Sequence, residues 1–375
     1  MEGPREVRSQ DMGSLRELTD TVMRVGLVDQ YPQLFNPANY ENLRICLDGD
    51  KVVSHVGMTL RDATLFGCRI RVALIGGVCT NPEYRKRGLA SACFDDAFRK
   101  ARADGADIMI VSGDRNLYRM RGCVHVGDDL EFIIARDAIP AGLVELSTGL
   151  SVEIMQAEEL PLVEECYRVE PVRFERPRED YRFAIDGGWV MNRPSDFLVI
   201  RRDGVFAGYA IAPRGGKDGS ARLAEFAGDR SAVLSAISHI LDRYSLSSVA
   251  IHVMRHDSVM RALCEQSGLV GSPRSTPGTV TLVNFPQLME RVLPFLAKYI
   301  GTDTAAGLRF HDSGDRAVFA LDGEELELGR FDAVRLLFGT REGSPEIAAE
   351  IPGPLGEALR TTLPLPTLWY GINYV

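Results

Sequence analysis

The segment from Val78 to Ala90 carries residue types that bind phosphate groups. It joins an apolar stretch that predicts a strand to a stretch that predicts a helix. Backbone N–H groups in a first helical turn have no acceptor within the helix, and the helix dipole adds partial positive charge there. A glycine lets the backbone approach a bulky anion. The residues that supply the charge and the glycine are Arg85, Lys86, Arg87 and Gly88. We therefore expect this segment to bind a diphosphate.

Two common phosphate-binding patterns do not fit this segment. A P-loop needs Lys-Ser or Lys-Thr after its second glycine, and the dinucleotide fingerprint needs three glycines where this loop has Gly88 alone. The loop does match Arg-x-x-Gly-x-Ala, from Arg85 to Ala90, with Pro82 and Tyr84 before it. It resembles the acetyl-coenzyme A loop of the GCN5-related N-acetyltransferases, Gln/Arg-x-x-Gly-x-Gly/Ala. The alternative is a solvated basic helix start on an ordinary α/β domain.

The resemblance implies a set of residues that bind acetyl-CoA as co-substrate. Backbone amides of residues 86–91 would hold the diphosphate, and the strand end at residues 78–80 would pair with the pantetheine arm. A short segment after the next strand would line that arm. The residues so implied are Val78, Cys79, Thr80, Arg85, Lys86, Arg87, Gly88, Leu89, Ala90, Ser91, Asp114 and Asn116.

Tyr118 is the candidate general acid. The family has a tyrosine four residues before a Gly-Phe pair; here Tyr118 and Gly122 fit, and Cys123 replaces the aromatic residue. From reference pKa values, proton transfer from a phenol to a thiolate is uphill by about 2 kcal/mol, which a catalysed step tolerates. The alternative role is a buried tyrosine whose hydroxyl bonds to the backbone.

The candidate base is the α-carboxylate of Val375, which is implied by the resemblance of the whole chain's organisation, described below, to the Eis-type acetyltransferases. An ordinary α-carboxylate is a poor base, but burial under an aromatic tail would raise its pKa. The alternatives are a water molecule or a side chain such as Glu83 or Asp114. Cys79 and Cys93 are weaker candidates as acetyl-enzyme nucleophiles, because neither has a histidine nearby in the sequence.

Composition excludes several functional classes. The net charge of -9 over 375 residues argues against a nucleic-acid partner. No apolar run is long enough to span a membrane, and the charged N-terminus does not resemble a signal peptide, so we expect a cytoplasmic protein without a membrane partner. The seven cysteines are scattered and show no metal-ligand spacing, which predicts free thiols and no metal site.

Secondary-structure patterns predict the family's element order in roughly the first 145 residues. An amphipathic helix is expected over residues 14–28 and a brief one over 116–122. Glu131–Ala135 is expected to close the sheet of this domain. The remaining predicted elements are strands at Leu43–Asp48, Lys51–Thr59, Cys68–Thr80 and Ile108–Ser112, and the helix from Leu89 to Ala103.

A second unit, residues 146–285, repeats this order without a phosphate loop. Where the loop would be, the sequence reads Gly228-Asp229-Arg230-Ser231, with an aspartate in place of a site for phosphate. The unit resembles a degenerate copy of the first; an unrelated α/β domain is the alternative. Its predicted strands are Phe197–Arg201, Val205–Ala212, Ala224–Ala227 and Val249–Val253, with helices at Ala232–Tyr244 and Ser258–Ser267.

The last part, residues 286–375, predicts a helix at Gln287–Ile300, short strands, and a helix at Pro354–Thr361. The chain ends in an apolar, aromatic tail, Leu363–Val375, which predicts a buried terminus. This three-part plan resembles the Eis-type (enhanced intracellular survival) acetyltransferases. The expected fold class is therefore α/β (α+β), with two tandem acetyltransferase folds, the second degenerate, and a small sterol-carrier-like C-terminal domain.

The predicted function is transfer of an acetyl group from acetyl-CoA to a primary amine. By resemblance the acceptor is an aminoglycoside, a polyamine-like molecule or a lysine, and the protein is a homo-oligomer. The alternative is a non-catalytic acyl-CoA or lipid carrier that uses its C-terminal domain. An intact Tyr118 favours the enzyme, because a carrier needs no proton donor.

Overall fold

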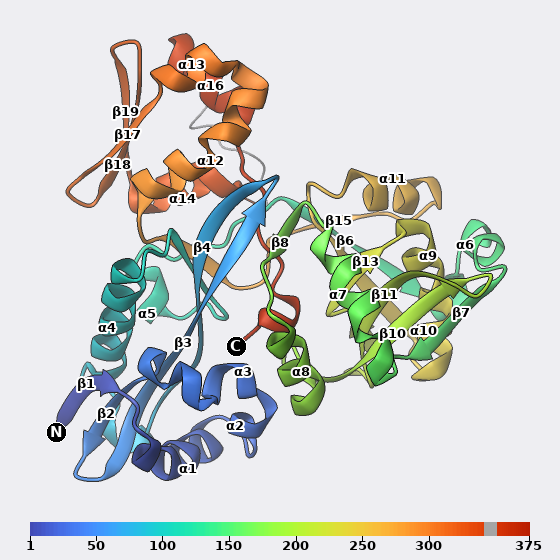
Figure 1. Cartoon of the computed structure of the whole chain (residues 1–375), viewed down its shortest axis with the longest axis horizontal. Helices are drawn as coiled ribbons and strands as arrows, with labels where there is room; N and C mark the ends of the chain where they lie inside the picture. The colour runs from blue at the N-terminus through green and yellow to red at the C-terminus, as the bar shows by residue number, and fades with distance from the viewer. Residues whose placement is uncertain (341–350) are drawn as a thin grey trace.

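The computed structural model describes residues 1–340 and 351–375, apart from the side chains of residues 144–146. It is a mixed α/β structure in three parts: an N-terminal part, a middle part, and a C-terminal part that sends its last residues back between the other two (Figure 1). Among the described residues, no helix is long and apolar enough to cross a membrane.

The N-terminal part is built on a sheet whose strands lie in the order β1-β2-β3-β4-β5-β16, with β8 paired to β3. Successive residues of β4 point to opposite faces of this sheet. Helices cover both of these faces. Ile70, Val72 and Leu74 join the core on one face with α1, while Ala73 and Ile75 join the core on the other with α4. The strands are β1 (Glu2–Glu6), β2 (Arg44–Asp48), β3 (Lys51–Leu65), β4 (Cys68–Thr80), β5 (Ile108–Val111), β8 (Val172–Phe174) and β16 (Thr279–Leu282). The helices are α1 (Met12–Val22), α2 (Leu27–Gln30), α3 (Pro32–Phe35), α4 (Leu89–Ala103) and α5 (Asn116–Arg119).

A bulge in β4 creates the cleft of this sheet. The register between β3 and β4 shifts between the pairs His55–Cys79 and Gly57–Gly76. β4 pairs in parallel with β5 only as far as Ile75, opposite Val111. Beyond that point no further pairing joins the two strands, which leaves room between their carboxyl ends.

The strand predicted to close this first sheet lies in another sheet, so that prediction is wrong. Residues 131–135 do form part of a strand, β6 (Asp129–Ala135), but it pairs with β14 and β15 of the middle part. Phe132 and Ile134 lie in the core of that part, which fixes the partner. The edge of β5 is taken instead by β16, whose residues are all buried. Each part thus lends a strand to the other, and the expected divisions at residues 145 and 285 do not follow the sheets.

The middle part contains the predicted strands in two sheets, ordered β13-β11-β10-β7, with β9 paired to β10, and β12-β14-β6-β15. Its strands are β7 (Leu150–Ile154), β9 (Trp189–Val190), β10 (Arg193–Arg202), β11 (Val205–Pro213), β12 (Ser220–Arg222), β13 (Glu225–Gly228), β14 (Ser248–Val253) and β15 (Ser272–Arg274). Its helices are α6 (Ala141–Leu146), α7 (Leu160–Arg168), α8 (Arg178–Gly187), α9 (Arg230–Ser235), α10 (Ile237–Arg243) and α11 (Ser258–Gln266).

The C-terminal part packs helices on a three-stranded antiparallel sheet. Its elements are α12 (Phe285–Ile300), α13 (Thr302–Gly307), β17 (Arg309–Ser313), β18 (Arg316–Leu321), β19 (Glu324–Gly329), α14 (Arg330–Phe338) and α16 (Gly353–Thr362). The tail after α16 then runs between the N-terminal and middle parts, and Val375 is 5% exposed (Figure 1). The prediction of a buried terminus is confirmed.

Candidate active site

The loop that is predicted to bind a diphosphate joins β4 to the first turn of α4. Gly88 precedes the first turn of α4 with φ of 76°, and Lys86 also has a positive φ of 61°. The amide of Ala92 donates to the carbonyl of Gly88 at 2.9 Å, so the three amides before it, in residues 89–91, have no acceptor within the helix. A Cβ at Gly88 would meet no atom within 4 Å, which leaves the space over these amides open.

The basic side chains of this loop are exposed and lie around the same turn. Arg85 Nε donates to the carbonyl of Thr80 at 3.3 Å, and an Arg87 Nη donates to the carbonyl of Glu83 at 3.1 Å. The Arg87 guanidinium also lies 4.9 Å from the ring centroid of Tyr84. Cations beside unpaired amides at a helix N-terminus fit the diphosphate of a nucleotide such as coenzyme A.

A cavity of about 200 Å³ lies where β4 and β5 separate. It brings together three residues that the sequence predicts for the site: Val78, Tyr118 and Val375. The other residues that line it are Met23, Leu27, Tyr31, Leu34, Phe35, Gly76, Gly77, Ser112, Gly113, Arg115, Asn192 and Tyr374. The other predicted cofactor contacts lie outside this cavity: those from Cys79 to Ser91 run from the end of β4 to the start of α4, and Asp114 and Asn116 lie just before and at the start of α5.

The chain terminus lies against the bulge in β4. Ser112 Oγ donates to the terminal oxygen of Val375 at 2.8 Å and lies 3.2 Å from the carbonyl oxygen of Ile75. A Cβ at Gly76 would be 2.0 Å from the terminal carbon of Val375. Only glycine leaves room for the terminus here, so Gly76 is required by this close approach.

Tyr118 lies across the cavity, on α5. Its ring packs 5.7 Å from that of Phe94, and its hydroxyl has no hydrogen-bond partner among the described residues. It therefore lacks the backbone bond of a purely structural tyrosine. Burial raises the pKa of Tyr118 to about 12, and the neighbouring Arg115 opposes part of that rise. The phenol is therefore protonated at neutral pH.

Other predicted residues are engaged elsewhere. The Asp114 carboxylate accepts two bonds of 2.6 Å from Arg119 and lies 3.0 Å from His125 Nε2. These partners hold the pKa of Asp114 well below its usual range, which makes it a weak base. Asn116 Nδ2 donates to Met120 Sδ at 3.4 Å. Neither side chain lines the cavity.

Cys79 and Cys93 both have a raised thiol pKa. Burial raises the pKa of Cys79 to about 12. Cys93 is fully buried with its Sγ 3.5 Å from Cys46 Sγ, and that contact together with burial raises its pKa as well. Because the thiolate is the nucleophilic form, neither residue is suited to forming an acetyl-enzyme.

His55 holds the bulge of β4 in place, and this residue was not predicted from the sequence. Its ring is fully buried, and Nδ1 donates to the carbonyl of Gly77 at 2.7 Å. Burial lowers the pKa of His55 to about 4, so the ring is neutral at pH 7. The pair Gly76-Gly77 inside a predicted strand was an available signal, since glycines within strands mark bulges and close approaches.

A buried ion pair in the middle part anchors the tail just before its end. The Arg176 guanidinium binds the Glu225 carboxylate with two bonds of 2.8 and 2.7 Å. Glu225 Oε2 accepts from the amide of Ile372 at 3.3 Å, and Arg176 Nε donates to Asn373 Oδ1 at 2.6 Å. A Cβ at Gly371 would lie 1.5 Å from the Glu225 carboxylate. We call Arg176, Glu225 and Asn373 the tail anchor.

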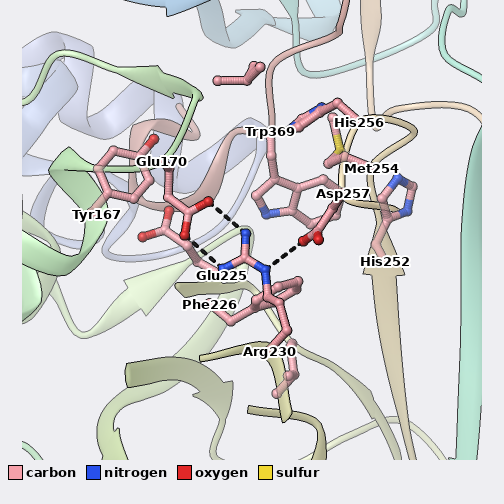
Figure 2. Close-up of a pocket in the computed structure, with 12 residues that line it drawn as sticks. Tyr167, Glu170, Glu225, Phe226, Arg230, His252, Met254, His256, Asp257 and Trp369 are labelled. Atoms are coloured by element: carbon pink, nitrogen blue, oxygen red, sulfur yellow. Dashed lines mark hydrogen bonds and ion pairs between the residues drawn. The ribbon is translucent and has the colours of Figure 1, made fainter. Parts of the chain in front are cut away.

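The corresponding cleft of the middle part, between β13 and β14, is a small pocket of about 60 Å³ whose charged side chains are paired with one another (Figure 2). Arg230, at the start of α9, is held by Glu170 at 2.6 Å and by Asp257 at 2.7 Å. Asp229 caps the same helix by accepting from the amide of Ala232 at 2.8 Å. Trp369 of the tail enters this cleft and donates to the carbonyl of Ala224 at 2.5 Å. The groups that would meet a cofactor are thus already paired.

Comparison with known proteins agrees with this geometry. Residues 4–126 match the family model described as an acetyltransferase (GNAT) domain. No curated protein matches the chain. Similar solved structures cover almost the whole chain. A GCN5-related N-acetyltransferase from Anabaena variabilis has a TM-score of 0.65 and 16% identity, covering 97% of this chain and 98% of that one.

Two further structures show the same likeness. A GCN5-related N-acetyltransferase from Kribbella flavida has a TM-score of 0.63 and 14% identity, covering 99% of this chain and 97% of that one. Eis1 from Mycobacterium abscessus has a TM-score of 0.61 and 12% identity, covering 96% of each chain. The chain therefore contains a GNAT acetyltransferase domain at its N-terminus and shares its overall fold with these proteins.

Proposed function

We propose that this protein is an acetyl-CoA-dependent N-acetyltransferase that acts directly on a primary amine. The observation that carries the proposal is that the Val375 terminus and the Tyr118 hydroxyl line one cavity at the end of β4. The N-terminal domain supports acyl transfer as the reaction class. A base and an acid in one cavity are what direct transfer needs, whereas a carrier needs neither.

Each residue has one task in this scheme. The Val375 carboxylate takes a proton from the acceptor ammonium, and the freed amine attacks the acetyl carbonyl carbon. The C–S bond then breaks, and the Tyr118 hydroxyl gives its proton to the coenzyme A thiolate. The second proton of the attacking nitrogen returns to the Tyr118 oxygen as the amide forms, and Val375 releases the first proton to water. The products are the acetylated amine and coenzyme A, with one proton released to water.

The buried phenol makes the last step costlier than reference values indicate. With the pKa of Tyr118 at about 12, donation to a thiolate near 8.5 is uphill by about 5 kcal/mol. We therefore expect proton transfer to accompany C–S cleavage rather than to follow it. Arg115 supports this step, because its Nη1 bonds the carbonyl of Val78 at 3.2 Å and its charge favours the phenolate.

The cofactor contacts complete the proposal. The amides of residues 86–91 and the side chains of Arg85–Arg87 would hold the diphosphate, and the strand end at residues 78–80 would pair with pantetheine. Asp114 and Asn116 would contribute only through their main chain, because their side chains are engaged elsewhere. The Eis-type plan, with domains at 1–145, 146–285 and 286–375, a sterol-carrier-like C-terminal domain and a homo-oligomer, belongs to the same proposal.

Adding residues after Val375 tests the proposal. Two glycines appended there move the carboxylate out of its place, so we expect turnover of acetyl-CoA with an amine panel to fall by at least about 100-fold. Coenzyme A affinity, measured by calorimetry, should not change. The control carries the two glycines before Met1. Normal turnover by the C-terminally extended enzyme would show that the terminal carboxylate is not the base.

A further inference from the structure

We infer that the acceptor is a small monoamine with an aromatic or branched apolar body, rather than a polyamine or an aminoglycoside. The inference rests on the proposed function and narrows its substrate class. It comes from the walls of the cavity in which Val375 and Tyr118 meet: their apolarity, their charge and the volume they enclose.

The wall opposite β4 is apolar and aromatic. It is formed by the segment from the end of α1 to the end of α3 and by the tail. Leu27, Tyr31, Leu34 and Phe35 are each at most 4% exposed. The side chains that make this wall are Met23, Leu27, Tyr31, Leu34, Phe35 and Tyr374.

The polar atoms of this wall are occupied with one another. The Tyr31 hydroxyl donates to Asn192 Oδ1 at 3.0 Å and accepts from the Asn192 amide at 2.9 Å. Asn192 Nδ2 donates to the Tyr374 hydroxyl at 2.7 Å. The two tyrosines therefore offer a ligand mainly their rings, which suit an apolar or aromatic body.

The charge around the cavity does not suit a polycation. Among the described residues that line it there is no aspartate or glutamate, so Val375 supplies its one carboxylate, and Arg115 adds a positive charge. Carboxylates on the neighbouring helices are engaged: Asp29 accepts from Arg16 at 2.8 Å, and Asp20 accepts from the amide of Gly26 at 3.0 Å. A second ammonium entering here would be desolvated without a partner, which is unfavourable.

The size of the cavity points the same way. Its volume is about 200 Å³, whereas pockets for drug-sized ligands are about 300–1,000 Å³. The cavity must also hold the acetyl group and the reacting nitrogen. A single ring on a short chain fits this volume, whereas most of a molecule of several sugar rings would lie outside the cavity.

Steady-state kinetics with matched amines tests this inference. With acetyl-CoA saturating, thiol release is measured for 2-phenylethylamine, for spermidine and for an aminoglycoside. We expect kcat/KM for 2-phenylethylamine to exceed both others by at least about tenfold, because an aryl group buried in an apolar pocket contributes that much discrimination. A higher value for spermidine or the aminoglycoside would overturn the substrate class and leave the acetyltransferase proposal standing. Release with none of the amines would overturn both.

The second measurement compares kcat/KM for two variants that each add a carboxylate, one at the cavity and one away from it. Met23→Glu adds a carboxylate at the cavity, on a side chain that is 42% exposed and tolerant of change. It should raise kcat/KM for spermidine at least about tenfold and lower it for 2-phenylethylamine. Val25→Glu is the control, because Val25 is 78% exposed and does not line the cavity. Equal effects of the two variants would show that the cavity wall does not select the acceptor.

Discussion

At Gly76 a missing side chain lets the end of the chain reach the cavity. Its φ is not in the left-handed region, so alanine is compatible with the backbone, but the new Cβ would lie 2.0 Å from the Val375 carbon. We predict that Gly76→Ala displaces the terminus and lowers kcat at least about 100-fold, with coenzyme A affinity retained. Gly13→Ala, whose Cβ meets nothing within 4 Å, should keep full activity. Gly76→Ala with wild-type turnover would contradict the position of the base.

Tyr118 gives a prediction about pH. A pKa of about 12 means that the phenol keeps its proton through the working range, so its ionisation cannot reduce the rate below that pH. We expect kcat, measured with both substrates saturating, to show no decrease up to pH 10.5. Tyr118→Phe should lower kcat about 100- to 10,000-fold and leave acetyl-CoA affinity unchanged. A basic limb below pH 10, or an equal loss of affinity, would remove Tyr118 as the acid.

At the residue scale, sequence reasoning found what motifs and unusual composition mark. The spacing before Gly122 marked Tyr118, and the aromatic tail marked a buried Val375; the structure places both at one cavity, while their roles stay predictions. Ser112, His55 and Asn192 were missed, because each acts through a contact with a residue far away in the chain. A single sequence holds no signal for such contacts.

At the scale of elements, the tail anchor fixes the last residues of the chain. Asn373 accepts from Arg176 Nε at 2.6 Å and donates to Asp180 at 3.3 Å, two residues before the carboxylate. We predict that Asn373→Ala lowers kcat about tenfold or more while the thermal midpoint changes little, because the ion pair itself remains. Glu225→Gln should instead destabilise the fold by about 3–5 kcal/mol, since it leaves Arg176 buried and unpaired. An unchanged kcat for Asn373→Ala would limit the anchor to a structural role.

The bounds of helices and strands were predicted well where the residues that set them are neighbours in the sequence. The bounds of α4 and β4 match the expected ones, because a glycine at the helix start and a polar break at the strand end are written in neighbouring residues. The partner of β6 was not predictable in this way. The alternation of apolar and polar residues shows that Phe132 and Ile134 lie on one buried face of the strand. It does not show against which core that face packs.

At the scale of the whole molecule, the middle part has a role in the site of the N-terminal part. Its own cleft is a small pocket whose Arg230 and Trp369 are already bonded within the protein, yet it carries Arg176 and Glu225, which anchor the tail. It also supplies Asn192 to the cavity wall. The middle part, which lacks the predicted phosphate loop, thus contributes side chains to the candidate site of the part that carries it.

Strand exchange predicts that the N-terminal part does not fold alone. A fragment of residues 1–145 lacks β16 at the edge of β5 and leaves β6 without its partners. We expect it to aggregate or to unfold without cooperativity in thermal melts followed by circular dichroism. Residues 1–126 joined by a glycine linker to residues 276–284 should recover a cooperative transition. Cooperative unfolding of the unlinked 1–145 fragment would contradict this role of β16.

The same exchange sets a waiting time during synthesis. Val111 of β5 pairs with Thr279 of β16, about 170 residues later, so at roughly 5–20 residues per second the edge of β5 is made some 10–30 s before its partner. Throughout that interval a nascent chain presents unpaired backbone groups on an apolar strand. Slower translation would lengthen this exposure, and chaperone capture of the nascent chain should concentrate in it.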